Sequence, residues 1–321
     1  NAATTALDPK VLEAMMPYLT EHYGNPSSIY SLGRETKMAI ENARKTVARL
    51  LGAHTSEIFF TSGGTESTNT AITAAVRDLG CTQIITSPIE HHATLHSAEY
   101  TCKASDITLT YVALDEKGHV ILEDLEEKIK NHQGRTLVTL MHANNEIGNL
   151  LKVKAVGDIC NKYDAIFHCD MVPTVGHFEI NLSELPVHFI SSAGHKLHGP
   201  KGIGVLYVSQ DVQIKPYIQG GAQERNMRAG TENLYGIVGY AKALELAMET
   251  YKQDSAYVAD LKQYMITLLE ENIEGVSFNG DYNGSSLYTI LNVSLPKTEK
   301  SEVLLYTLDM NGICISGGSA C

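Results

Sequence analysis

Short apolar segments alternate with amphipathic segments over most of the chain, and this alternation constrains the fold more than any other feature. The apolar segments have the length of β-strands and include residues 57–61, 82–87, 135–143 and 165–170. The stretches between them place apolar residues at helical spacing. Strands that alternate with helices are typical of an α/β domain with a mostly parallel sheet. We therefore predict such a sheet, flanked by helices, for most of the chain.

The pattern differs on either side of this region. Two helices are predicted before the first strand, over residues 9–19 and 31–52. After about position 230 the predicted elements are two long helices (232–250 and 254–273), a strand (288–295), a helix (301–312) and a strand (313–316). We therefore predict a large domain of residues 10–250 and a smaller α+β domain of residues 1–9 and 251–321.

Composition excludes several classes of function. The 321-residue chain carries a formal net charge of −12, which disfavours nonspecific binding to nucleic acid because phosphates would be repelled. No apolar run is long enough to span a bilayer, and the first residues do not resemble a signal peptide. The six cysteines form neither a metal-binding spacing nor a disulfide framework, so we expect a reducing, cytoplasmic compartment.

Polar residues follow the predicted strands at the points where they end. The sequence SGGTES (62–67) opens a helix with two glycines, where backbone N–H groups and the helix dipole would suit a phosphate, although an ordinary glycine turn has the same sequence. His91 and His92 follow the next strand and could stack on a ring, move protons or cap a helix. Asn144 and Asn145 follow a third strand, where, taken singly, they favour a structural turn because asparagine tolerates turn conformations well.

Asp170 and Lys196 add two charged groups to this set. A carboxylate that ends a buried strand needs a partner, which could be a protonated ring nitrogen, a metal or an arginine. His168 and Asp170 merely share a strand face and a third ligand is not apparent, so we do not expect a metal. Lys196 lies between two apolar strands, where a lysine of lowered pKa can form a Schiff base. Together, a phosphate cradle, a stacking ring, a carboxylate and a lysine are the groups that pyridoxal phosphate requires.

Longer motifs support a specific resemblance. In order along the chain they are AATT, YGNPSS, FTSGGTES, EHHA, MHANNEIG, SAGHKLHGPKGIG, RAGTEN and GGSAC. This series resembles the cysteine desulfurases, which belong to the aminotransferase class V group of pyridoxal-phosphate enzymes. It is most similar to the branch that supplies sulfur for iron–sulfur clusters and tRNA thiolation. The resemblance covers essentially the whole chain and implies the type I fold of pyridoxal-phosphate-dependent transferases.

The resemblance also implies roles for individual residues. Lys196 matches the lysine that binds the cofactor covalently and moves protons at the substrate Cα, and Asp170 matches the partner of the ring nitrogen. His91 matches the ring-stacking histidine, and Cys321 matches the nucleophile that takes sulfur from L-cysteine, leaving alanine and a persulfide. The remaining matches are to cofactor contacts: Gly64, Thr65 and His195 to the phosphate, Asn145 near the ring oxygen, and Thr231 to the phosphate from the second subunit. A homodimer and a sulfur-acceptor protein, such as an iron–sulfur scaffold or thiolation carrier, are therefore implied partners.

Three departures from the family pattern bear on these expectations. Pro173 stands where the family usually has a glutamine, so a hydrogen bond to the cofactor's phenolic oxygen is lost. Ala193 stands where a hydroxyl residue is usual, and Ser192 cannot replace it because neighbouring strand residues face opposite ways. We therefore expect weaker retention of the cofactor. Family chains also continue beyond the catalytic cysteine, so we expect the natural chain to extend past Cys321.

Two alternative functions fit the same motifs. A selenocysteine lyase, or another class V lyase or transaminase, would use the same cofactor for a different reaction. A degenerate relative that acts only as a binding partner would be marked by Pro173 and Ala193. The glycines of GGSAC favour the desulfurase, because a thiol on a flexible loop can reach first the cofactor and then an acceptor.

Overall fold

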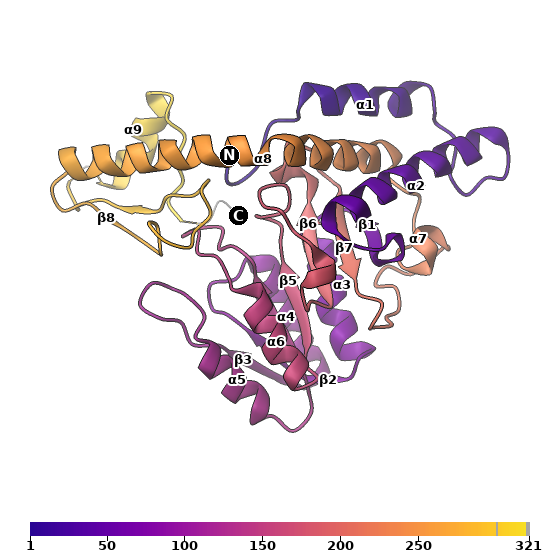
Figure 1. Cartoon of the computed structure of the whole chain (residues 1–321), viewed down its shortest axis with the longest axis horizontal. Helices are drawn as coiled ribbons and strands as arrows, with labels where there is room; N and C mark the ends of the chain where they lie inside the picture. The colour runs from indigo at the N-terminus through magenta and orange to yellow at the C-terminus, as the bar shows by residue number, and fades with distance from the viewer. Residues whose placement is uncertain (300, 319–321) are drawn as a thin grey trace.

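A seven-stranded sheet forms the centre of the protein (Figure 1). The computed structural model describes residues 1–299 and 301–318. The strands lie in the order β1-β7-β6-β5-β4-β2-β3, and β7 alone runs antiparallel to its neighbours in this sheet. Their bounds are β1 Ile58–Thr61, β2 Cys81–Thr86, β3 Thr108–Tyr111, β4 Arg135–Met141, β5 Ile166–Asp170, β6 Phe189–Ala193 and β7 Gly204–Val208. The predicted mostly parallel α/β sheet is confirmed.

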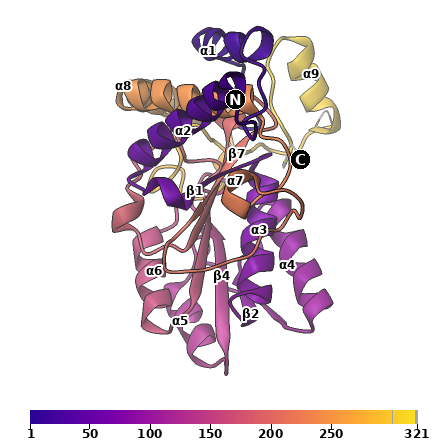
Figure 2. The same cartoon turned by 90° about the vertical axis from the view of Figure 1, so that its right-hand side faces the viewer.

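Helices cover both faces of this sheet (Figure 2). On one face lie α3 (Gly64–Arg77) and α4 (His92–Ser105), which pack on an apolar cluster that includes Phe59 and Phe189. The opposite face carries α2 (Ser31–Leu51), α5 (Leu122–Lys130), α6 (Val153–Lys162) and the first part of α8 (Leu234–Asn272). Helix α1 (Pro9–Thr20) packs on α8, and the short α7 (Gln223–Asn226) precedes α8. The structure is therefore a three-layered α/β domain, as the type I fold implies.

The C-terminal part differs from the sequence-based expectation. The two predicted helices are one continuous helix, α8, so the break expected at residues 251–253 was wrong. The predicted strand over 288–295 contributes only β9 (Val293–Ser294), which pairs with β8 (Ser277–Phe278), and residues 313–316 have irregular backbone instead of a strand. Helix α9 (Leu304–Met310) confirms the predicted last helix. The two-domain assignment stays a prediction, and its boundary at residue 250 falls within α8.

Four of the cysteines are part of the core. Cys81, Cys102, Cys160 and Cys169 are buried as free thiols, whereas Cys314 is exposed. Burial raises the pKa of Cys81 and of Cys160 to about 12, so both stay protonated at neutral pH. The interpretation of these cysteines as small apolar residues is confirmed, because a protonated buried thiol is a poor nucleophile.

Candidate active site

The carboxyl ends of β1, β2, β4, β5 and β6 lie along one edge of the sheet, so the segments that follow these strands all begin at that edge. Asp170 ends β5, where its register partners are Met141 of β4 and Ser191 of β6. Its side chain is buried, and Oδ1 accepts the Val172 N–H at 3.0 Å. Burial raises the pKa of Asp170 to about 6, while Val172 and the Lys196 ammonium act to lower it. The pKa of Asp170 therefore stays above its ordinary value, and a protonated ring nitrogen beside this carboxyl group would lower it.

The His91 ring lies close to the same lysine. His91 is half-buried at the start of α4, where its Nδ1 accepts the Ala93 N–H at 3.1 Å. Burial lowers the pKa of His91, and Lys196 and His92 lower it further. The structure therefore confirms that the neutral ring caps α4, and a stacking role beside Lys196 stays a prediction.

The predicted phosphate cradle lies directly against the other site segments. Gly63 adopts φ 153°, a conformation that residues with a side chain rarely adopt, and α3 begins at the next residue. A Cβ on Gly64 would lie 2.5 Å from Val172 Cγ2 and 3.9 Å from Ala193 Cβ. The first distance is too short for a side chain, so glycine allows the start of α3 to pack against Val172, while the second is an ordinary contact. Thr65 follows Gly64 and is exposed.

Lys196 lies at the edge of a cavity of about 450 Å³. Its Nζ donates to the Ala2 carbonyl at 2.6 Å, and the His195 carbonyl accepts the Thr5 N–H at 2.9 Å. Residues 2–5 therefore lie against the loop that follows β6. The cavity also receives Asn145 and Pro173, together with side chains of α8 and of residues 287–290. A cavity of this size matches a small-molecule site.

The two neighbouring asparagines have different roles. Asn144 is buried, donates to the Ile89 carbonyl at 2.8 Å, and accepts the N–H groups of Glu146 and Ile147, both at 2.9 Å. Asn145 instead lines the cavity with Lys196. The turn that the sequence left open is therefore formed by Asn144, and this turn presents Asn145 to the cavity.

The structure separates Ser192 from the cradle. The Ser192 hydroxyl is hydrogen bonded to the Tyr240 hydroxyl of α8, on the face of β6 opposite α3. Ser191 faces α3, where its Oγ accepts from Thr68 Oγ1 at 3.0 Å. This confirms that Ser192 does not replace the hydroxyl absent at Ala193.

The structure does not bring every predicted residue into this cluster. Thr231 is exposed on the segment that leads into α8. Cys321 lies outside the described residues, so its predicted place at the site is not described. His168 Nδ1 lies 2.8 Å from Thr139 Oγ1 and its Nε2 lies 2.9 Å from Ser191 Oγ, so this histidine belongs to a buried hydrogen-bond network below the site.

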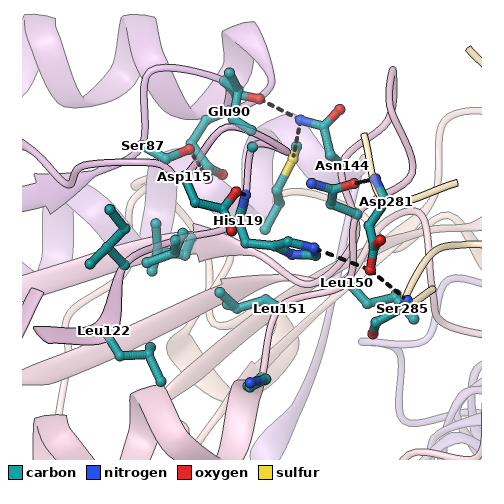
Figure 3. Close-up of a pocket in the computed structure, with 18 of the residues that line it drawn as sticks. Ser87, Glu90, Asp115, His119, Leu122, Asn144, Leu150, Leu151, Asp281 and Ser285 are labelled. Carbon is teal, nitrogen blue, oxygen red and sulfur yellow. Dashed lines mark hydrogen bonds and ion pairs between the residues drawn. The ribbon is translucent and has the colours of Figure 1, made fainter. Parts of the chain in front are cut away.

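Sequence reasoning missed Glu90, which precedes His91. Glu90 is buried beside a second cavity of about 540 Å³, and Ser87 Oγ donates to Glu90 Oε1 at 2.7 Å (Figure 3). Burial raises the pKa of Glu90 to about 8, so it is largely protonated at neutral pH. The sequence signal was weaker than for Asp170, because Glu90 stands four residues beyond the end of β2 whereas Asp170 is the last residue of β5. Figure 3 also shows His119 pointing toward Asp281 at the mouth of this cavity.

Within the described ranges, 1–299 and 301–318, no group of three or more His, Cys, Asp or Glu side chains is arranged to hold a metal ion. No helix in the same ranges is long and apolar enough to cross a membrane.

Known proteins resemble this chain over its whole length. The profile of the family "Aminotransferase class-V" matches residues 1–321. The chain belongs to the aminotransferase class V family. A curated protein named "Cysteine desulfurase IscS" from Dictyoglomus turgidum is 43% identical over 322 residues, covering all of this chain and 80% of that protein.

Solved structures place this class V chain in the same fold. A "NIFS-LIKE PROTEIN" has a TM-score of 0.91 at 38% sequence identity, covering 98% of this chain and 86% of the other. A structure titled "SspA in complex with cysteine" has a TM-score of 0.83 at 32% identity, covering 99% of this chain and 88% of the other. The fold is therefore that of the NifS-like enzymes of type I.

Proposed function

We propose that this class V protein is a cysteine desulfurase, which removes sulfur from L-cysteine with pyridoxal phosphate and forms L-alanine and a persulfide on Cys321. The proposal is supported by two observations: the Lys196 ammonium acts on the pKa of both Asp170 and His91, and Gly64 lies close to Val172, which follows Asp170 in the chain, and to Ala193, which precedes Lys196. Relatives named as cysteine desulfurases support the substrate and the reaction.

The residues present fit the cofactor. A glycine at the start of α3 leaves room and N–H groups for a phosphate, and Asp170 would hold a proton on a ring nitrogen. The His91 ring would lie on the cofactor ring, and Asn145 would approach the ring oxygen. When bound, pyridoxal phosphate supplies an electron sink that weakens the bonds at the Cα of an amino acid.

Three residues of the chain would then contribute to the reaction. Lys196 would hold the cofactor covalently and would move a proton at the substrate Cα. Asp170 keeps its negative charge when a protonated nitrogen lies beside it, which offsets the cost of its burial. The Cys321 thiol takes the sulfur atom of cysteine, so that cysteine and a thiol become alanine and a persulfide. The carbon–sulfur bond of cysteine breaks and its sulfur bonds to the Cys321 sulfur, while the electron pair left on the carbon takes a proton. Carbon is reduced as sulfur is oxidised, so the step needs no external oxidant.

The proposal extends to partners and location. Thr231 would reach the phosphate of a second subunit, so the working unit would be a homodimer, and the persulfide would pass to a sulfur-acceptor protein such as an iron–sulfur scaffold or thiolation carrier. A cytoplasmic location is supported by cysteine usage that forms no disulfide framework.

The decisive experiment incubates the purified protein with L-cysteine and pyridoxal phosphate and measures alanine and protein-bound persulfide. We expect both products from the wild type and neither from Lys196→Ala. Cys321→Ala should retain the cofactor's visible absorption and lose the persulfide. Alanine formation that is unaffected by Cys321→Ala, or activity with selenocysteine alone, would contradict the assignment.

A further inference from the structure

Glu66 places a carboxylate against the loop that forms the predicted phosphate cradle. Its Oε2 accepts the Ser62 N–H at 2.9 Å, and its side chain is only 8% exposed. This bond closes the loop formed by residues 62–66 and so helps to set its shape. A negative charge at the start of α3 would also repel a phosphate, and burial makes that repulsion stronger than it would be in water. The cradle therefore needs a compensating positive charge.

Arg228 supplies this charge from a distant part of the sequence. Its Nε donates to Glu66 Oε1 at 3.0 Å and its Nη2 donates to Oε2 at 3.3 Å, a two-pronged contact between residues 162 positions apart. Burial acts to raise the pKa of Glu66, but the hydrogen bonds from Arg228 and Ser62 hold it below the ordinary value. Glu66 is therefore ionised and paired at neutral pH.

Arg228 belongs to a segment, residues 222–231, that is fixed to the domain by a second and more deeply buried ion pair. Both carboxylate oxygens of Glu224 accept from the Arg44 guanidinium at 2.8 Å, and Oε2 also accepts the Phe60 N–H at 2.8 Å. The two side chains are 2% and 3% exposed. The next residue, Arg225, donates to Glu41 Oε2 at 2.8 Å.

The backbone of this segment is held in a costly conformation. Glu224, Arg225 and Asn226 have φ values of 44°, 58° and 64°, in the left-handed region that residues with a side chain seldom occupy. Such conformations persist only where the surroundings impose them, and they cluster at functional sites. The ion pairs to Arg44 and Glu41 hold residues 224 and 225 in this conformation. Arg228, three residues further on, then lies beside Glu66.

We propose that Arg228 is a positioning residue for the cofactor phosphate: it neutralises Glu66 and holds the 62–66 loop in the shape that binds phosphate, while Arg44 and Glu224 keep Arg228 in place. The inference rests on the proposed function, because it assigns the cradle to pyridoxal phosphate. It connects α2 and the 222–231 segment to the retention of the cofactor.

The test compares two ligands that differ only in the phosphate. Apo protein is titrated with pyridoxal phosphate and with pyridoxal, and binding is followed by visible absorption. For Arg228→Gln we expect the Kd for pyridoxal phosphate to rise at least tenfold and the Kd for pyridoxal to stay within twofold of wild type. The double variant Arg228→Gln with Glu66→Gln should regain most of the lost affinity, because it leaves no unpaired carboxylate.

A matched control is Arg135→Gln. Arg135 is similarly half-buried and paired with Asp164 at 3.2 Å, but it begins β4 at the opposite edge of the sheet, so neither affinity should change. Arg228→Lys keeps the charge and loses the two-pronged contact, and should bind pyridoxal phosphate with an affinity between wild type and Arg228→Gln. If Arg228→Gln does not fold, Arg228→Lys is tested instead. Its Kd for pyridoxal phosphate should rise, while its Kd for pyridoxal stays within twofold of wild type.

The proposal is overturned if Arg228→Gln binds pyridoxal phosphate as the wild type does, if pyridoxal affinity falls equally, or if the double variant is no better than the single one. Failure of the proposed function has a different signature, since wild type itself would then release no alanine from cysteine.

Discussion

At the scale of single residues, the site contains two buried carboxyl groups with opposite expected roles. Burial raises the pKa of Asp170 to about 6 and the Lys196 ammonium acts to lower it, so a further positive partner would keep Asp170 ionised. Glu90 is held by Ser87, and its pKa is raised to about 8 by burial, with a smaller contribution from the Asp170 charge. Glu90 is therefore the neutral one of the two carboxyl groups. Its ionisation at higher pH should lower the free energy of unfolding.

We predict that Glu90→Gln flattens the pH dependence of stability between pH 6 and 8. A raised folded pKa means that the native state holds the proton over a range in which the unfolded state has released it, so the free energy of unfolding falls as the pH rises. The slope due to one such group is up to about 1.4 kcal/mol per pH unit. Urea unfolding of apo protein at both pH values measures it.

The control is the exposed carboxylate Glu116, whose replacement by glutamine should leave the slope as in the wild type. Equal slopes for Glu90→Gln and wild type would show that Glu90 is already ionised in the folded protein.

At the scale of elements, the alternation along β6 decides which hydroxyl can reach the cofactor. Ala193 lies toward Gly64, whereas Ser192 lies toward Tyr240 of α8. Two adjacent positions of one strand therefore serve different layers of the domain. The side chain at position 193 therefore belongs to the predicted cradle, whereas the Ser192 hydroxyl belongs to the core.

We predict that Ala193→Ser tightens the binding of pyridoxal phosphate by about tenfold, which corresponds to about 1.4 kcal/mol, within the range for a hydrogen bond to a charged group. Ser192→Ala should leave that affinity unchanged and lower the free energy of unfolding by about 1 kcal/mol, because the buried Tyr240 hydroxyl loses its partner. Cofactor titration and urea unfolding of both variants separate the two effects. A loss of affinity in Ser192→Ala would show that the alternation is not the deciding factor.

At the scale of the whole molecule, the site is expected to be completed by a second copy. Thr231 is exposed, and the 222–231 segment that carries it is fixed to its own domain through Arg44 and Glu66. A rigid segment that ends in an exposed threonine suits a contact across a two-fold axis, in which each subunit contributes to its partner's site.

We predict that mixed dimers of Lys196→Ala and Thr231→Ala subunits recover activity that neither homodimer has in full. In such a dimer, the site with an intact Lys196 receives Thr231 from the other subunit, so one of the two sites is complete. Alanine formation after co-refolding of the two variants measures this recovery, with each variant refolded alone as the control. If Thr231 serves its own subunit, mixing gives only the average of the two homodimers.

Much of the site could be predicted because its signals are local. Asp170 and the SGGTES stretch each follow an apolar strand, and parallel strands bring their carboxyl ends to one edge whatever the loop lengths. The break predicted within residues 232–273 was wrong for the opposite reason: the polar residues at 252–255 weaken the periodic pattern locally, yet α8 continues through them.

The sequence by itself determined the mostly parallel sheet and most of the helices that flank it, since hydrophobic periodicity is a property of a few neighbouring positions. Only the tertiary structure decided that Arg228 meets Glu66 and that Arg44 meets Glu224, residues 162 and 180 positions apart. It also decided that Glu90 would be neutral, because burial and not residue type sets that pKa. Long-range pairing and burial depend on the packing of whole layers, and no local pattern encodes them.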